Sequence, residues 1–411
     1  MTLSRSDRAH LLTKIDELVS VKFYDPAFGG MNWGEIVPLH RDAILNADSN
    51  AAFDGAVTDM LLELPSSGLG ILGPETKITP RNSINASFRS IRLSEEGMRW
   101  VFQDIQPGGV AERAGIRPGD ALIAIDTTPV VPPEQPAFRM SERVPVVISR
   151  DGQRRDVHID LTTQKPKFQD NPYSEPKSVT AKVIDSSVGN LKVSLFPGLL
   201  GIDFANTVSA LFTETLKDTR RLLLDLRGNP GGGVGGLRLM SYLTSGRQPV
   251  GYSLDRATAE HGYDRESLPR FSHIPRSKLE APLLALKFLG KKSIVLETEG
   301  LGRQSFHGRV VIVVNEHSTG AAEMLTQFAQ ENGLATVVGT HTPGHLVTRS
   351  AFKIGHGYRI VIPIAAYMSW NGNRIEGKGI APDVPIDWSY EQAHHGIDNQ
   401  LDRALEVVQS L

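Results

Sequence analysis

Two turns in the second half of the chain carry residue types that suit chemistry on a carbonyl group. Residues 222–226 read as a buried strand, and the run Asp-Leu-Arg-Gly-Asn-Pro-Gly-Gly-Gly covers residues 225–233 at its end. Glycines in such a turn let backbone N–H groups face a ligand oxygen, as in an oxyanion hole. A phosphate-binding loop is a competing interpretation, but the Gly-Lys-Ser/Thr of such loops does not follow. A plain tight turn is the third interpretation.

The second turn brings hydroxyl and imidazole groups together. Residues 310–314 are Val-Val-Ile-Val-Val, and the run Asn-Glu-His-Ser-Thr-Gly-Ala-Ala-Glu covers residues 315–323. A serine in a turn that enters a helix would lie at the helix N-terminus, where the dipole favours developing negative charge. Ser318 is therefore a candidate nucleophile. His345 lies in the loop of residues 339–345, and histidine can act as a general base near neutral pH.

The periodicity of the chain predicts the elements that would position these turns. From about residue 178, apolar runs typical of strands alternate with helical patterns, which predicts βα units and a mostly parallel core. Residues 1–64 read as helical, and the tail of residues 399–411 reads as an amphipathic helix. The stretch from about residue 85 to 161 reads instead as strands joined by turns.

That strand-rich stretch resembles a PDZ domain. Residues 107–120 read Pro-Gly-Gly-Val-Ala-Glu-Arg-Ala-Gly-Ile-Arg-Pro-Gly-Asp and precede an apolar strand. PDZ domains bind an extended peptide as an added strand at a sheet edge. The resemblance implies peptide-binding residues at Ala86, Ser87 and Phe88. This stretch lacks the glycines that let backbone N–H groups converge on a carboxylate.

The two turns, the loop of residues 339–345 and a late run, Glu-Gly-Lys-Gly-Ile-Ala-Pro-Asp at residues 376–383, together resemble the S41 (carboxyl-terminal-processing) serine peptidases. This resemblance covers nearly the whole chain. It implies an α/β fold: a crotonase/ClpP-like catalytic domain with a PDZ-like β-rich module and an N-terminal helical region. It also implies that a backbone N–H of Gly231 or Gly232 supplies an oxyanion donor.

The resemblance further implies altered catalytic positions. In the family the nucleophilic serine stands three residues before a glutamate, and counting back from Glu323 gives Gly320. The Ser/Lys branch delivers its lysine base from the loop in which His345 stands here. The tricorn-like branch uses a Ser-His pair, which matches Ser67 followed by Gly68, and a glutamate, which matches Glu376.

Three functions remain open from these residues. A working peptidase would use a shifted dyad of Ser318 and His345. A non-hydrolytic descendant would bind a polypeptide or a peptide C-terminus through the PDZ-like module. A repurposed enzyme would use Ser67, His345 and Glu376 for acid–base work on a small molecule, because a fold does not settle function.

The predicted organisation has four parts. These are an N-terminal helical region (residues 1–80), a PDZ-like domain (81–165), an S41 crotonase-like α/β domain (175–390) and a C-terminal helix (391–411). A length of 411 residues with 40% hydrophobic residues fits a globular chain of more than one domain.

Composition narrows the classes of partner and cofactor. The chain has no cysteine, which excludes disulfides and thiolate metal sites, and no His/Asp/Glu spacing typical of a metal site, so no cofactor is expected. A net charge of −2 gives no sign of a nucleic-acid or anionic-membrane partner. Lys287, Lys291 and Lys292 are interpreted as a solvated helix face.

Membrane and export signals are also missing from the sequence pattern. No apolar run is long enough to span a bilayer. The first residues form no apolar signal segment, which predicts a cytoplasmic protein as written and an exported one if a leader has been trimmed. Whether the protein forms an oligomer stays open.

Overall fold

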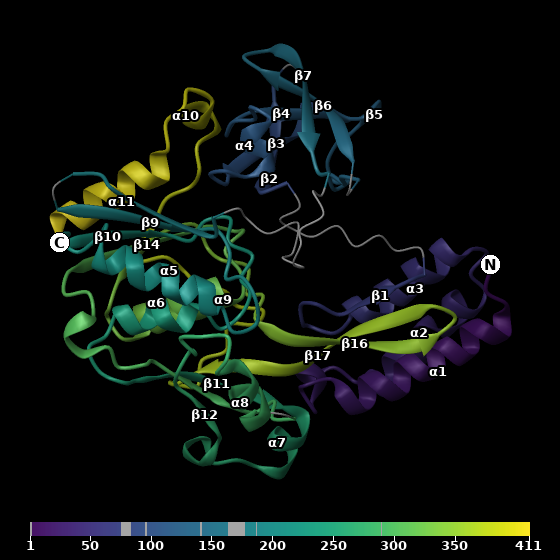
Figure 1. Ribbon diagram of the computed structural model, residues 1–411. Coiled ribbons are helices and arrows are strands. Elements are labelled where there is room, and N and C mark those ends of the chain that lie inside the picture. The colour runs from purple at the N-terminus through teal and green to yellow at the C-terminus, as the bar shows by residue number, and fades with distance from the viewer. Residues whose placement is uncertain are drawn as a thin grey trace.

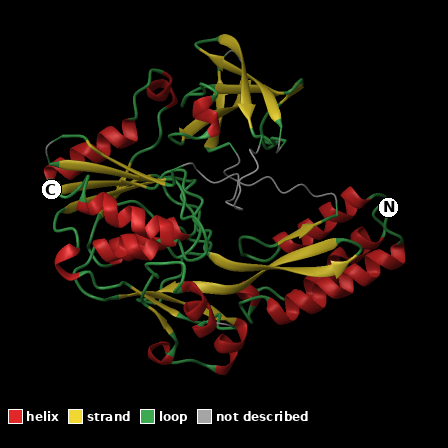
Figure 2. Cartoon of the chain, in the orientation of Figure 1, coloured by secondary structure: helices red, strands yellow, loops and turns green. Residues whose placement is uncertain are grey.

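Three sheets and a layer of N-terminal helices make up the computed structural model (Figure 1, Figure 2). The structure describes residues 2–74, 84–94, 97–139, 142–162, 177–185, 187–288 and 290–411. The predicted domain boundaries at residues 80–81 and 165–175 lie outside these ranges. Across the ranges that are described, no helix combines the length and apolar character needed to cross a bilayer.

The N-terminal residues form helices that pack against a long β-hairpin. α1 (Arg5–Lys22) begins with a capping box between Ser4 and Asp7. The layer continues with η1 (Phe28–Gly30), α2 (Trp33–Leu45), α3 (Asn50–Leu62) and the short strand β1 (Gly70–Leu72). Their apolar side chains share one core with β16 (Val347–Gly355) and β17 (Tyr358–Ser369). The predicted helical region is thereby confirmed.

The strand-rich stretch forms a sheet of its own. Its elements are β2 (Ala86–Leu93), β3 (Gly97–Ile105), α4 (Val110–Arg113), β4 (Ala121–Ile125), β5 (Thr128–Pro129), β6 (Arg143–Arg150) and β7 (Gln153–Asp160). The strand order is β2-β3-β4-β6-β7, so β2 lies at an edge of this sheet. Phe102, Leu122 and Ile148 are fully buried in its core, together with Ala111 of α4.

A six-stranded sheet forms the centre of the chain. Its order is β18-β15-β14-β10-β9-β8, and its strands are β8 (Val179–Val183), β9 (Val188–Val193), β10 (Arg221–Asp225), β14 (Arg309–Val314), β15 (Thr336–Gly339) and β18 (Val384–Pro385). Its pairs are parallel except for β8 with β9. The prediction of a mostly parallel core is therefore confirmed.

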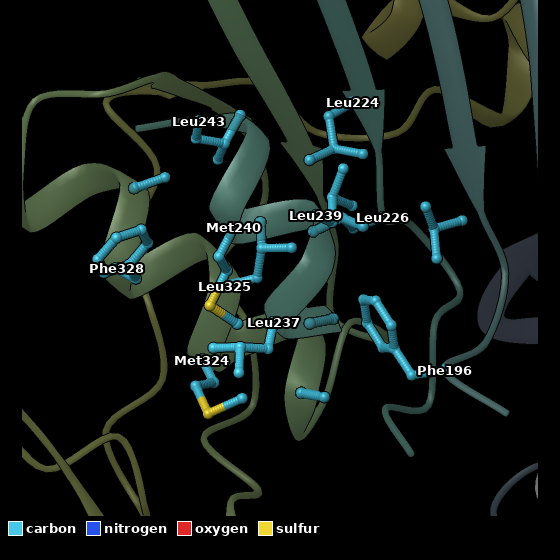
Figure 3. Packing of buried hydrophobic residues seen from close by; sticks show 14 of the residues in the cluster. Phe196, Leu224, Leu226, Leu237, Leu239, Met240, Leu243, Met324, Leu325 and Phe328 are labelled. Atoms are coloured by element: carbon cyan, nitrogen blue, oxygen red, sulfur yellow. The ribbon is translucent and has the colours of Figure 1, made fainter. Parts of the chain in front are cut away.

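Helices cover both faces of this central sheet. On one face, Leu222 and Leu224 share a core with α5 (Ile202–Thr213), α6 (Gly236–Tyr242) and α9 (Ala321–Glu331). Figure 3 shows Leu224 and Leu226 among side chains of α6 and α9. On the other face, Leu223 packs with residues of α11 (Asn399–Ser410). Burial on both faces explains why β10 and β14 read as unbroken apolar runs.

The third sheet joins the N-terminal layer to the core. Its order is β1-β17-β11-β13-β12, with β16 also paired to β17, and its further strands are β11 (Pro249–Asp255), β12 (Arg270–Phe271) and β13 (Val295–Glu297). The remaining helices are α7 (Arg256–His261), η2 (Arg265–Ser267), α8 (Ala281–Lys287), η3 (Gly302–Gln304) and α10 (Tyr390–His394). β17 ends shortly before Glu376.

Candidate active site

Three neighbouring parallel strands bring three loops to one edge of the central sheet. β10 pairs with β14, and β14 pairs with β15, in register from Asp225 opposite Val313 to Val314 opposite Gly339. The loops that follow are the oxyanion turn (residues 228–233), the nucleophile turn (residues 315–320) and the base loop (residues 340–345). Because the carboxyl ends of parallel strands meet at the same edge, segments far apart in sequence become neighbours.

The oxyanion turn presents one of its two predicted donors. The Gly231 N–H is bonded to the side-chain oxygen of Asn229 at 2.8 Å, so this donor is occupied. The Gly232 N–H carries no hydrogen bond to any described residue. Gly232 has φ +136°, and a Cβ there would overlap the carbonyl oxygen of Phe196. The turn therefore needs glycine at 232 and leaves that N–H available.

Ala321 supplies a second available donor that the sequence interpretation did not identify. It is the first residue of α9, and its N–H has no hydrogen bond to a described residue. The first N–H groups of any helix lack an intrahelical partner. The Ala321 nitrogen lies 3.1 Å from where a Cβ on Gly231 would be, so it borders the oxyanion turn. The signal for it was its place directly after the nucleophile position.

Gly320, at the predicted nucleophile position, has a backbone conformation that most residues avoid. Its φ is +62° and its ψ is −119°, and holding a non-glycine residue in such a region costs roughly 1–3 kcal/mol. Space is not the obstacle. The nearest atom to an added Cβ is the Gly231 Cα at 3.5 Å, followed by the Pro230 oxygen at 3.8 Å and the His345 carbonyl oxygen at 3.9 Å. A side chain at 320 would point between the oxyanion turn and the base loop.

Glu323 ties the nucleophile turn to the base loop. Its fully buried carboxylate accepts hydrogen bonds from the N–H groups of Gly320 (3.0 Å), Gly344 (2.6 Å) and His345 (2.9 Å) and from the Thr342 hydroxyl (2.7 Å). Burial raises the pKa of Glu323, although these hydrogen bonds act in the opposite direction. This one side chain sets the distance between the nucleophile position and the base loop.

The side chain of Ser318 is buried and hydrogen-bonded to the backbone. Its side chain is fully buried, and its hydroxyl donates to the Leu226 carbonyl at 2.9 Å and accepts from the Asn315 N–H at 2.9 Å. The hydroxyl therefore joins the nucleophile turn to the end of β10. No hydrogen bond to His345 is recorded for it within the described chain, and this geometry argues against the shifted Ser318–His345 dyad.

The side chain of Glu376 contacts the backbone of Ser67. The buried Glu376 carboxylate accepts hydrogen bonds from the N–H of Ser67 and from the N–H of Leu346 at 2.8 Å. It thus holds the segment after α3 against the residue that follows His345. Nδ1 of His345 is buried and has no hydrogen-bond partner among the described residues.

Arginine takes the room that a histidine would need at position 68. Gly68 has φ +78°, and a Cβ there would overlap the Cδ of Arg349. Arg349 belongs to β16, which lies close to the segment after α3 through the pairing of β1 and β16 with β17. The Arg349 side chain therefore fills the space beside Ser67 in which a side chain at position 68 would lie.

The predicted peptide-binding residues lie at the start of the edge strand β2, with Ala86 and Phe88 facing the core of the PDZ-like sheet and Ser87 facing the opposite side. Ala86 is buried, and Phe88 packs on Phe102 with ring centroids 4.6 Å apart. The Ser87 hydroxyl donates to Asp104 at 2.6 Å, and the same Asp104 oxygen accepts from the Asn315 side chain at 2.8 Å. Ser87 thus helps to hold the PDZ-like sheet on the nucleophile turn, while the outer edge of β2 has no paired strand in the described structure.

A buried charge cluster beneath the oxyanion turn was not identified from sequence. Arg227 contacts Asp225 at 2.8 Å and Asp398 at 2.7 Å, and Lys192 lies 3.2 Å from Asp225. Burial opposes ionisation of Asp225, but the attraction of Arg227 and Lys192 outweighs it and holds the pKa of Asp225 well below its usual range. The cluster anchors the start of the oxyanion turn to the residue before α11.

Comparison with known proteins agrees with this geometry. Residues 187–386 match the model of peptidase family S41, and residues 101–143 match a PDZ domain model. The α/β core of this chain belongs to peptidase family S41. The fold expected from the sequence, an α/β peptidase domain with a PDZ module and an N-terminal helical region, is confirmed.

Relatives with assigned names support the same family. The chain is 24% identical over 387 residues to carboxyl-terminal-processing peptidase 3 of Arabidopsis thaliana, covering 89% of this chain and 66% of that protein. It is 23% identical over 418 residues to a tricorn protease homolog of Streptomyces coelicolor, covering 96% of this chain and 32% of that protein. The chain therefore spans less than two thirds of the length of these two relatives.

Among solved structures, the photosystem II D1 C-terminal processing protease has a similar fold. The TM-score is 0.58 at 18% identity, with 98% of this chain and 97% of that chain covered. At this identity the likeness concerns the fold. Both the nucleophile turn and the oxyanion turn lie within the matched S41 residues.

Proposed function

We propose that this chain binds polypeptide segments at its S41 site and does not cleave them through an acyl-enzyme. The observation that carries the proposal is Gly320, which stands in the turn between β14 and α9 with room for a side chain and none present. Acyl transfer needs an attacking group. Ser318, the nearest serine in the same turn, is buried and hydrogen-bonded on both sides.

Without an attacking side chain, the site is expected to retain only a small part of a peptidase's rate enhancement. An acyl-transfer site that keeps its oxyanion donors but loses its catalytic residues retains a rate enhancement of about 10³–10⁴ over water. Enzymes in general reach roughly 10⁶–10¹⁷. With Gly232 and Ala321 as the remaining donors, the site suits holding a peptide carbonyl better than cleaving it.

Two features support a polypeptide as the bound partner. The outer edge of β2 has no paired strand in the described structure, and an extended peptide can add to such an edge. The PDZ-like sheet contacts the nucleophile turn through Asp104 and Asn315. A peptide on β2 would therefore lie close to the oxyanion donors.

The test uses a fluorophosphonate probe, which labels an activated serine, together with casein as an unstructured substrate. For the wild-type chain we expect no label and no casein fragments by intact mass, but retention of casein on the immobilised chain. Ser318→Ala should behave in the same way. A label that maps to Ser318 and disappears in Ser318→Ala would overturn the proposal in favour of a shifted nucleophile.

A second candidate function rests on a different observation. His345 has a buried Nδ1 without a hydrogen-bond partner in the described chain, and its backbone borders Gly320. An imidazole beside two carbonyl-polarising N–H groups is suited to acid–base work on a small carbonyl compound. Native mass spectrometry of the purified chain distinguishes the two: a bound small molecule that is lost in His345→Ala favours this candidate, and its absence favours polypeptide binding.

A further inference from the structure

The short helix α8 is apolar on two opposite sides. Its inner side is used, because Ala281, Leu284 and Phe288 pack against the main core and the Phe288 ring meets Phe271 with centroids 5.5 Å apart. A helix that is apolar all round is normally buried all round. The outer side of α8 therefore calls for a cover that no described residue provides.

That outer side carries a row of leucines. Leu279, Leu283 and Leu286 expose 89%, 74% and 70% of their surface. Leu283 and Leu286 lie three residues apart on one face of α8, and Leu279 lies in the turn directly before the helix. Other strongly exposed leucines, such as Leu39 and Leu62, are not part of such a row. Contiguous exposed apolar residues of this kind mark interaction sites.

Basic residues flank the exposed leucines in the sequence. Residues 276–292 contain five basic side chains and one acidic side chain, within a chain whose net charge is −2. The basic residues are Arg276, Lys278, Lys287, Lys291 and Lys292. Lys278 pairs with Asp203 at 2.9 Å, and Lys292 attracts the Asp255 carboxylate. Lys287 lies over the Phe288 ring, with its Nζ 5.5 Å from the ring centroid. The overall charge of the chain conceals this local concentration.

We propose that this surface, formed by residues 276–288 with Lys291 and Lys292, docks on the anionic surface of a lipid bilayer. Leucines that insert at the interface and lysines that reach the headgroups are the two contributions that hold an amphipathic helix on such a membrane. Charge complementarity selects the anionic bilayer, and lysine side chains can extend to the headgroups while their stems lie along apolar surface.

Two other occupants fit the same features less well. A second copy that docked by this surface around a two-fold axis would place the basic residues of both copies together, which is repulsive. A protein partner would need a groove that matches three protruding leucines, whereas a fluid bilayer accommodates them without one. Figure 1 shows α8 with α7 in a lobe at the edge of the molecule away from the PDZ-like sheet, and the three leucines are exposed.

The inference is tested with the full chain and vesicles, in a flotation assay. Vesicles of phosphatidylcholine alone should recruit little protein, and equimolar phosphatidylcholine and phosphatidylglycerol should recruit it in a salt-sensitive manner. A lysine near an anionic surface contributes about five-fold in affinity, so Lys287→Ala with Lys291→Ala and Lys292→Ala should weaken binding by about 100-fold.

The leucine row has a matched control. Leu283→Ser with Leu286→Ser should weaken binding to the anionic vesicles at least ten-fold, while Leu39→Ser with Leu62→Ser, at equally exposed positions, should leave it unchanged. Equal thermal midpoints for the two double variants show that both fold. Equal binding by both, or no recruitment of the wild type, overturns the proposal.

Two further readouts address the other occupants. Sedimentation equilibrium of the wild type and the Leu283→Ser, Leu286→Ser variant would overturn the proposal if it revealed a dimer that depends on these leucines. Binding to poly-glutamate without binding to the vesicles would overturn it in favour of an acidic protein partner.

Discussion

The oxyanion turn and the nucleophile turn lie side by side, but glycine stands in them for different physical reasons. A Cβ on Gly231 would come within 2.8 Å of the Thr319 oxygen, and one on Gly232 would overlap the Phe196 oxygen. These obstacles are backbone atoms, which cannot move aside. A Cβ on Gly320 would meet nothing closer than 3.5 Å. In the oxyanion turn, glycine is required because a side chain would clash with the backbone. In the nucleophile turn, glycine only avoids the backbone strain of a positive φ.

This difference shows which part of the site is preserved by packing. The backbone donors are built into the fold, since a side chain at 231 or 232 would displace the backbone of Thr319 or Phe196. Position 320, the predicted nucleophile position, lies on a turn with room for a side chain, so the fold neither excludes nor requires a side chain there. A retained oxyanion turn is therefore evidence of the family's fold, and the residue at 320 is evidence about chemistry.

Gly232→Ala tests whether the oxyanion turn requires glycine for steric reasons, and it is expected to have the largest effect. Overpacking costs about 1–3 kcal/mol and backbone strain costs a similar amount, so we expect a loss of about 4 kcal/mol in the free energy of unfolding. Urea denaturation measures it. The matched control is Gly262→Ala, where φ is +77° and no atom lies within 4 Å of the added Cβ; a loss of about 1 kcal/mol is expected there. Equal losses at both positions would contradict the comparison.

The support beneath the oxyanion turn is tested by Asp225→Asn. Removing one partner of a buried ion pair is expected to cost about 3 kcal/mol near neutral pH, because Arg227 loses a charged partner. The pKa of Asp225 is lowered in the folded state, so its contribution is full above the unfolded value of about 3.9 and is lost as the pH falls below it. The stability difference between wild type and variant should therefore narrow in acid. A difference that grows as the pH falls would be inconsistent with this assignment.

Ser318→Ala separates structure from chemistry within the nucleophile turn. It leaves the buried Asn315 N–H without its partner, which is expected to cost about 2 kcal/mol, whereas the Leu226 carbonyl keeps the hydrogen bond from the Asn229 N–H at 3.2 Å. Casein binding should be unchanged. Ser410→Ala, at an exposed serine of α11, serves as the control and should stay within about 0.5 kcal/mol of wild type. Loss of casein binding in a folded Ser318→Ala chain would assign the hydroxyl a direct role.

Gly320→Ser is expected to have the smallest effect on stability and the most informative effect on reactivity. Strain at φ +62° should cost about 1 kcal/mol. The new hydroxyl would stand beside the N–H groups of Gly232 and Ala321, so we expect fluorophosphonate labelling at residue 320. Gly320→Ala provides the same strain without the hydroxyl and should remain unlabelled. A severe loss of stability in both variants would show that position 320 is sterically restricted after all.

Much of the architecture was readable from local patterns. The apolar runs at residues 222–226 and 310–314, the glycine run after the first of them and the small residues after the second predicted two strand-to-loop junctions of a parallel sheet. Counting back from Glu323 located Gly320 at the nucleophile position. The strands and turns depend on neighbours in sequence, so local patterns are enough to find them, whereas the role given to position 320 came from the resemblance to S41 peptidases.

Other features depend on contacts across the chain. Ala321 emerged as a donor because α9 begins beside the oxyanion turn, whereas the loss of the predicted Gly231 donor to Asn229 is a local contact between residues two apart. Arg349 reaches the space beside Gly68 from β16, and Asp398 reaches Arg227 from the residue before α11.

The sequence by itself determined the family of motifs, the order of the elements and the absence of a side chain at position 320. Only the tertiary structure decided which groups around that position are available. Burial and many hydrogen bonds are set by residues that are distant along the chain. The hydroxyl of Ser318 reads the same in a sequence whether it faces a substrate or, as here, the Leu226 carbonyl after β10. The physical reason is that reactivity depends on the unoccupied hydrogen-bonding capacity of a group, and the fold distributes that capacity.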